Sequence, residues 1–238
     1  MRHSPVFALT DPTAVAQLVR DHPWATLVSN TSDGLVASHY PVLIDEGVDG
    51  SLALLTHVGR PDERLHELGE HELLVVVQGP HGYVSPGWYD EHPAVPTWNF
   101  VTAHLYGTPE LLDPAENLRV LEQLVDHFEQ RMPEPRSMRG TLANSAYADR
   151  ISAGTVGLRI PVERFTAKLK MSQNRTEGSL RRIVEALEGD GPYASAELAE
   201  QVRRANPEVF ATTTPSAVPT ASPSAPSAPT APSEETSG

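Results

Sequence analysis

Polar and aromatic side chains recur at the ends of the segments that have strand-like sequences. They are His39, Tyr40, Thr56, His57, Tyr83, Ser85, Trp98, Asn99 and His104. A pocket lined by such residues has flat apolar walls and a few hydrogen-bonding groups, which is typical of a cofactor site. Each residue alone is more often an ordinary core aromatic or a satisfied polar group. The set together predicts a small-molecule pocket.

The two lysines of the chain, Lys168 and Lys170, are two residues apart in the segment AKLKMSQN. Alternate residues of a strand project to the same face, so both ammonium groups can meet the phosphate or carboxylate of one ligand. Ser172, Gln173 and Asn174 follow and add hydroxyl and amide partners. A charged strand end is most often simply solvated, which makes this segment a weak signal by itself.

Common catalytic signatures are absent from the sequence, including the P-loop, a G-x-G-x-x-G turn after a strand, the G-x-S-x-G elbow and H-E-x-x-H. The absence of cysteine excludes disulfides, zinc–thiolate sites, iron–sulfur clusters and cysteine nucleophiles. His66 and His71 are five residues apart on a polar stretch, a spacing that does not place them on one helical face. We expect both histidines on the surface.

Charge and composition narrow the class of partner. The 238 residues carry a formal net charge of −13. The Pro/Ala/Ser/Thr-rich residues 211–238 contain Glu234 and Glu235 as their only charged side chains, which leaves −11 for the remainder. DNA binding by phosphate neutralisation requires a basic face, so direct nucleic-acid binding is not expected. Ten of the eighteen basic residues lie within 150–204, an enrichment that more often marks solvated helix faces.

The apolar runs of the chain are all too short to span a bilayer, and the first residues, MRHSPVFALTDP, do not resemble a secretory signal. We therefore expect a cytoplasmic protein without membrane contact.

Turn and cap residues divide the chain into strands and helices. A helix begins at Pro12 after the N-cap Asp11 and ends before Pro23, and a hairpin joins 24–30 to 35–44 around Ser32-Asp33-Gly34. Further strands are expected over 51–58, 73–79, 94–112, 154–160 and 162–171. The strand over 94–112 is expected to bend at Pro96 and Gly107. A short amphipathic helix is expected over 61–72. Longer helices are expected from Pro114 to about Arg131 behind an Asp113/Glu116 capping box, around Tyr147, and on stripes that include Leu180 and Leu198.

This order of elements predicts an α+β protein built on a small antiparallel barrel with peripheral helices. We expect one folded domain over residues 1–206. Residues 207–238 are expected to be a disordered tail, because their apolar area is too small to offset the entropy of ordering.

Three separated motifs carry a resemblance to a known family. QGPHGYVSPGWY (78–89), VPTWNF (95–100) and KLKMSQN (168–174) resemble the PaiB-type family of FMN-binding split-barrel proteins, over roughly residues 1–206. The resemblance implies a split β-barrel and a homodimer that holds its cofactor near the subunit interface. Members are described as negative transcriptional regulators, and the family also includes piperazate synthase, a haem protein that forms an N–N bond.

The sequence departs from the family pattern after the histidine of the third strand. FMN-type members have an H-x-x-R-x-N arrangement there, whereas this chain has His57, Arg60 and Asp62. A carboxylate near the FMN phosphate is unfavourable because like charges repel. This departure weakens the case for FMN binding in the usual manner.

The resemblance leads to a haem b-dependent enzyme as the first hypothesis, one that cyclises the hydroxylated amino acid N5-hydroxy-L-ornithine to L-piperazate. His57 is the expected axial ligand of the iron, with His104 as the alternative, and His39 and Tyr83 are the expected distal proton-transfer groups. The expected cofactor contacts are Arg60, Ser85, Trp98, Asn99, Lys168, Lys170, Ser172, Gln173 and Asn174. The alternative hypothesis is an FMN-binding negative transcriptional regulator or a flavin-dependent oxidoreductase.

Overall fold

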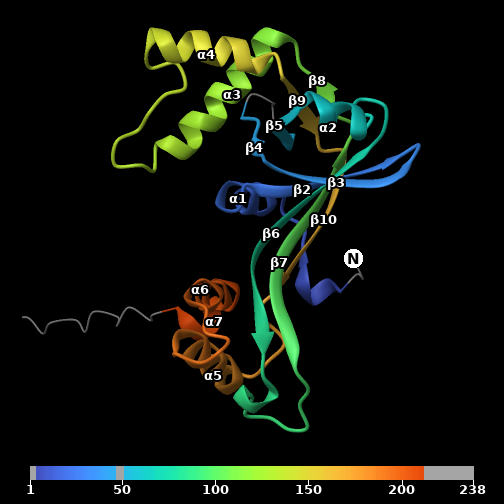
Figure 1. The fold of residues 1–238 in the computed structure, drawn as a ribbon. Coiled ribbons are helices and arrows are strands. Elements are labelled where there is room, and N and C mark those ends of the chain that lie inside the picture. The colour runs from blue at the N-terminus through green and yellow to red at the C-terminus, as the bar shows by residue number, and fades with distance from the viewer. Residues whose placement is uncertain (1–3, 47–50, 212–238) are drawn as a thin grey trace, which may run out of the picture.

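The computed structural model describes residues 4–46 and 51–211, which form two antiparallel sheets and a set of helices around them (Figure 1). The six-stranded sheet has the order β1 (Ala8–Leu9), β10 (Arg164–Lys170), β7 (Thr97–Gly107), β6 (Leu73–Val84), β2 (Trp24–Thr31) and β3 (Gly34–Pro41). The four-stranded sheet has the order β4 (Leu43–Ile44), β5 (Ala53–Gly59), β9 (Thr155–Pro161) and β8 (Glu110–Leu111).

The helices follow the expected order. They are α1 (Pro12–Asp21), α2 (Arg60–Leu65), α3 (Pro114–Glu129), α4 (Leu142–Ser152), α5 (Glu177–Glu188), α6 (Ala196–Ala205) and α7 (Pro207–Phe210), with short 3-10 turns η1 (Pro5–Phe7) and η2 (Pro86–Trp88). Asp11 caps α1 by accepting from the backbone N–H of Thr13, and Asp113 and Glu116 form the predicted capping box of α3. Within the described parts of the chain, no helix is both long and apolar enough to cross a membrane.

Strand β6 is longer than predicted, because it continues past Gly79 to Val84. The Gly79-Pro80 pair is accommodated as a register shift between Gln78 and His81 opposite β7, where a bulge replaces the expected end of the strand. A Cβ atom on Gly79 would lie 2.7 Å from a methyl group of Val101 and 2.9 Å from one of Leu18. Glycine is therefore required where β6 passes beneath α1.

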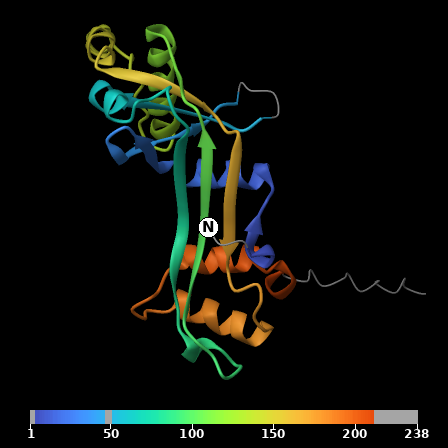
Figure 2. The ribbon, with the colours of Figure 1, turned by 90° about the vertical axis from the view of Figure 1, so that its right-hand side faces the viewer.

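The main core lies between the six-stranded sheet, the helices on one side of it, and strands β5 and β9 of the second sheet. Residues Leu73, Val75 and Val77 of β6 alternate with outward-facing neighbours, as do Val101, Ala103 and Leu105 of β7. Helices α1, α5 and α6 lie on the core side of β6 and β7 (Figure 1). In Figure 2 the strands are seen from the opposite side, with these helices behind them. We call this second surface the outward face of the sheet.

The predicted boundary of the domain needs a correction. Helix α7 occupies residues 207–210, inside the segment expected to be a disordered tail. Val209 and Phe210 pack against the main core, and the carbonyl of Val209 accepts a hydrogen bond of 3.0 Å from Arg181. The folded part therefore extends beyond residue 206, and the rest of the predicted tail, 212–238, lies outside the described residues.

Gly107, the last residue of β7, lies against the end of β9. A substitution at Gly107 tests this close approach of the two strands. A Cβ atom there would lie 1.9 Å from the carbonyl oxygen of Pro161, so Gly107→Ala forces two backbone segments apart. We expect a loss of about 1–3 kcal/mol in the free energy of unfolding, the usual cost of overpacking. The measurement is the urea midpoint at an unchanged m-value.

The matched control for this variant is Gly191→Ala, because a Cβ atom on Gly191 meets nothing within 4 Å. The two variants should differ clearly in midpoint. Equal midpoints would show that β7 and β9 do not approach each other as described.

Candidate functional site

One row of paired residues crosses the six-stranded sheet and brings two of the predicted site histidines onto the same face. His39 pairs with Thr26, Thr26 with Val76, Val76 with His104, and His104 with Thr166. Directly paired residues of an antiparallel sheet project to the same side. Because their sequence neighbours Ala25, Val75, Ala103 and Ala167 are in the core, this row belongs to the outward face.

Lys168 and Lys170 lie on the outward face beside this row. They pair with Thr102 and Phe100, while Ala167 and Leu169 pack on the core side, so the predicted alternation is present. Lys170 donates a hydrogen bond to the hydroxyl of Thr97, and its Nζ lies 6.0 Å from the ring centroid of Phe7.

The charges around the two lysines favour an anion. Burial, with repulsion from Lys168 and Arg175, lowers the pKa of Lys170. The third cation of β10, Arg164, pairs with Glu72 at 2.5 Å and stacks on Tyr106, whereas Lys168 and Lys170 make no ion pair within residues 4–46 and 51–211. A phosphate would relieve this concentration of positive charge.

The outward face also carries aromatic rings and a groove. Trp98, 54% exposed, lies edge-on to Tyr83 with ring centroids 6.4 Å apart. A groove of about 440 Å³ is lined by Trp24, Thr26, Val76 and Gln78 of the sheet, by His22 and His81, and by Phe128 of α3. Trp24 stacks on His39 at 6.4 Å and 18°. This volume is in the range of small-molecule sites.

The register relates the groove to the lysines. Gln78 pairs with Thr102, which pairs with Lys168. Two strand spacings, about 10 Å, therefore separate the groove from the first ammonium group. Sequence reasoning missed Trp24, Gln78 and Phe128, although an exposed tryptophan at the start of a strand was a usable signal.

Asn99 and Ser172, two of the predicted cofactor contacts, lie on the core side of the sheet. Asn99 is completely buried on the core side of β7, because it alternates with the outward Trp98. Its Oδ1 accepts a hydrogen bond of 3.1 Å from the buried hydroxyl of Ser172. Both side chains are buried in the described structure, where the pair joins β7 to the turn after β10, and their contact with a cofactor stays a prediction.

The turn after β10 holds the other two polar residues of this motif. The side chain of Gln173 accepts from the N–H of Met171 at 2.7 Å and donates to the carbonyl of Leu169 at 2.6 Å. Gln173 thereby fixes the turn, whereas Asn174 is exposed. Ser85 similarly caps η2 by accepting from the N–H of Gly87.

His57 and Arg60 lie apart from the outward face, at the junction of β5 and α2. The His57 ring stands edge-on to Tyr40 at 6.0 Å, burial lowers its pKa, and its Nδ1 is buried without a hydrogen-bond partner in the described structure. Arg60 pairs with Glu63 at 2.8 Å. The structure thus separates the expected iron ligand His57 from the expected proton-transfer residue Tyr83, which is near the far end of β6.

Asp62, the acidic departure from the family pattern, is engaged within the chain. Its carboxylate accepts a hydrogen bond of 2.5 Å from Tyr40, whose hydroxyl in turn accepts from the N–H of Gly59 at 3.3 Å. Burial and the bond to Asp62 raise the pKa of Tyr40. The charge of Asp62 therefore serves to hold α2 against β3.

His66 corrects another prediction, since it is only 2% exposed and not at the surface. Its Nδ1 is hydrogen-bonded to Ser29 at 2.8 Å and its Nε2 to Ser38 at 3.0 Å. Helix α2 ends at Leu65, and the chain then turns His66 onto the β2–β3 hairpin. Burial lowers the pKa of His66, against a smaller opposing effect of Asp62.

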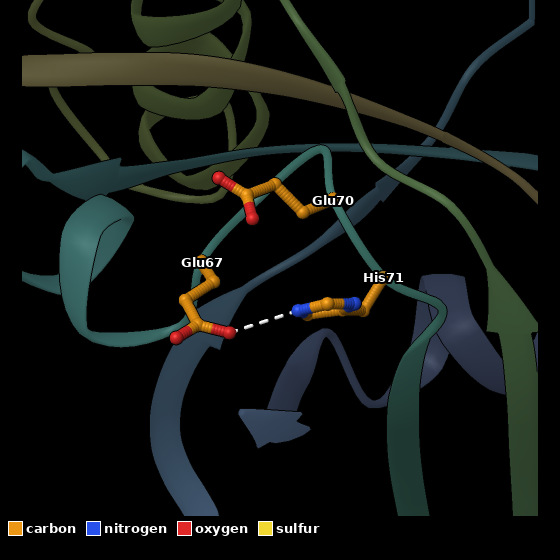
Figure 3. Close-up of side chains that lie close together, drawn as sticks. All are labelled: Glu67, Glu70 and His71. Carbon is orange, nitrogen blue, oxygen red and sulfur yellow. Dashed lines mark hydrogen bonds and ion pairs between the residues drawn. The ribbon is translucent and has the colours of Figure 1, made fainter. Parts of the chain in front are cut away.

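His71 is exposed as predicted and belongs to a cluster with Glu67 and Glu70 (Figure 3). Glu67 accepts from His71 at 2.8 Å and from the backbone N–H of Ser32 at 3.1 Å. Hydrogen bonds from the hydroxyl of Ser32, from His71 and from the backbone N–H of Ser32 lower the pKa of Glu67. The cluster ties the segment after α2 to the hairpin turn.

Comparison with known proteins identifies relatives of this chain. Residues 1–164 match the protein family described as "Putative FMN-binding domain". The chain is 29% identical over 196 residues to Protease synthase and sporulation protein PAI 2 of Bacillus subtilis, covering 82% of this chain and 92% of that protein. It is 33% identical over 126 residues to an uncharacterized protein of Saccharomyces cerevisiae, covering 49% and 74% respectively.

Solved structures share the fold. The FAD- and haem-binding protein from Mycobacterium smegmatis superposes with a TM-score of 0.50 at 22% identity, over 68% of this chain and 73% of that one. The flavocytochrome Anf3 from Azotobacter vinelandii does so with a TM-score of 0.50 at 16% identity, over 93% and 88%. The predicted α+β split-barrel fold and the resemblance to PaiB-type proteins are confirmed.

The buried histidine predicts a pH dependence of stability. The pKa of His66 in the folded protein lies below its unfolded value of about 6.5, so below that pH the unfolded chain binds a proton that the folded chain does not. Stability is therefore full above about pH 7.5 and falls as the pH drops through 6.5 towards the folded pKa. His66→Gln should lose about 1–3 kcal/mol at pH 7.5 and depend less on pH from 7.5 to 5.5, as measured by urea unfolding.

The control for this experiment is the exposed His71→Gln, which should keep the pH dependence of the unaltered protein. If His66→Gln shows the same slope as this control, the histidine is not the buried group that we describe.

Proposed function

The chain belongs to the FMN-binding domain family, and from this premise we propose that it is a flavin-dependent oxidoreductase that binds FMN on the outward face of its six-stranded sheet. The observation that carries the proposal is the pair Lys168 and Lys170, two neighbouring cations without an ion-pair partner in the described structure, beside an aromatic groove. FMN combines a planar apolar ring with a phosphate, which matches this combination.

The residues present fit FMN. Lys168 and Lys170 would hold the phosphate as charge-assisted donors, because their repulsion is relieved when a dianion binds between them. Trp24 and Phe128 would contact the ring in the groove. The separation of about 10 Å between the two parts is one that the flexible arm of the cofactor spans. Asp62 does not oppose binding, since it is held by Tyr40 away from this face.

Bound FMN would supply reversible hydride or single-electron transfer. The chain itself would position the cofactor and control protons near it. His39 and His104 lie in one row of the outward face. Because burial lowers the pKa of His104, its imidazole is neutral at neutral pH and has one nitrogen free to accept a hydrogen bond. Gln78 offers an amide in the same groove.

We also propose that a second copy of the chain covers the outward face. Trp24, Leu35 and Trp98 on this face are 63%, 79% and 54% exposed, and they supply apolar surface for a contact with a second copy. A homodimer would exclude water from the flavin ring. The expected result is a dimer mass by light scattering.

A haem protein is the second candidate, and one observation favours it. His104 is a half-buried, neutral imidazole on the same face as the other candidate residues, whereas His57 lies elsewhere. The favoured iron ligand is thus His104. The finer hypothesis, cyclisation of N5-hydroxyornithine, rests on the family resemblance alone. The net charge of −13 continues to disfavour direct nucleic-acid binding.

Flavin titration tests the main proposal. FMN added to the purified chain should bind with shifted visible absorption and quenched fluorescence. Lys168→Ala and Lys170→Ala should each weaken binding about 10- to 100-fold, the effect of losing a charge-assisted contact. Arg204→Ala removes an exposed cation of α6 and should leave affinity unchanged. FMN binding that is equally strong in all three variants would contradict a phosphate site at the lysines.

Haem titration separates the second candidate from the first. A Soret band that shifts on dithionite reduction would indicate a haem protein, and its loss in His104→Ala but not in His57→Ala would place the iron on the outward face. Retention of the band in His104→Ala with loss in His57→Ala would move the iron to β5. Flavin bands without haem uptake would leave FMN as the cofactor.

A further inference from the structure

We propose that a cleft between the far end of β6 and the loop joining α5 to α6 binds a small organic ammonium ion. The cleft measures about 540 Å³ and is lined by Tyr83, Ser85, Trp88, Asp190, Tyr193 and small residues of the loop. Its volume is in the range of small-molecule sites. This site is separate from the groove near Trp24 and does not depend on the proposed flavin.

Aromatic rings form the walls of the cleft. The ring centroids of Tyr83 and Tyr193 are 4.8 Å apart, with the planes tilted by 43°, and Trp88 of η2 lines the same space. Tyr193 keeps 51% of its surface exposed. The negative faces of aromatic rings attract cations, and several rings around one space are the usual receptor for alkylated ammonium groups.

The charge of the cleft selects a cation. Asp190 is its one charged lining residue, and the carboxylate makes no ion pair or hydrogen bond with the rest of the described structure. Asp190 lies two residues after the end of α5, whose last turn contains no basic residue. The negative end of the helix dipole therefore adds to the carboxylate, and no protein cation in the cleft balances them.

The backbone around the cleft is fixed before any ligand binds. The N–H of Ser195 donates to the carbonyl of Leu187 at 2.7 Å, and that of Ala194 donates to Gly191 at 3.0 Å. On the other wall, Asp90 accepts from the hydroxyls of Ser179 and Thr176 and so holds the segment after η2 against α5. A preorganised cleft loses little entropy when a small ligand binds.

Other ligand classes fit less well. An anion would be repelled by Asp190 and by the end of α5. A neutral apolar molecule would contact the rings but would gain no attraction from the exposed carboxylate. An ammonium ion with methyl or methylene groups uses both features, because its apolar surface contacts the rings while its charge faces Asp190.

Calorimetric titration of the full chain with choline, without flavin, tests the proposal. The comparison ligand is 3,3-dimethylbutan-1-ol, which has the shape of choline without its charge. Choline should bind saturably, and the neutral alcohol at least about tenfold more weakly. Asp190→Asn and Tyr193→Leu should each weaken choline binding by about tenfold. FMN affinity should be unchanged in Asp190→Asn, so failure here is distinguishable from failure of the flavin proposal.

Two variants serve as matched controls. Asp126→Asn removes an exposed carboxylate of α3, and Tyr147→Leu removes a tyrosine of α4 that is 55% exposed, close to the 51% of Tyr193. Both should bind choline like the unaltered chain, and circular dichroism should show all four variants folded. The proposal is overturned if choline gives no saturable heat, if the alcohol binds equally well, or if Asp190→Asn binds like Asp126→Asn.

Discussion

The two-residue alternation along β6 and β7 is the constraint on which the rest of the structure depends. Every second residue from Leu73 to Val77, and from Val101 to Leu105, enters the core beneath α1 and α6. The residues between them must then project to the outward face, where His104 and the partners of the two lysines lie. Burial of one face therefore sets the position of every candidate ligand group on the other.

The bulge at Gly79-Pro80 extends this constraint to a second site. Beyond the bulge, β6 continues to Val84, where Gly82 and Val84 face the core and the ring of Tyr83, between them in sequence, contacts Tyr193 of the loop after α5. Had β6 ended at Gly79, Tyr83 would not be held beside the loop after α5. The groove near Trp24 is lined by residues up to the bulge and just beyond it, and the aromatic cleft by Tyr83 further along the same strand.

Local patterns predicted most of the elements, but they did not predict every residue of the site. Cap and turn residues predicted helices α1 and α3 and the β2–β3 hairpin. The two-residue alternation of strands predicted that Lys168 and Lys170 lie on one face. The motif VPTWNF suggested that Trp98 and Asn99 act together, although alternation sends adjacent strand residues to opposite sides. His66 could not be placed from its neighbours, because its partners Ser29 and Ser38 come from a hairpin far away in sequence.

The hydrogen bond between Asn99 and Ser172 affects which residues of such a protein can be substituted during evolution. Their hydrogen bond joins β7 to the turn after β10 on the core side, without using any side chain of the outward face. In the proposed function, folding and ligand binding therefore depend on different residues of the same strand. Substitutions at the outward positions can exchange one cofactor or substrate for another while the scaffold stays intact, which makes a single fold available to several chemistries.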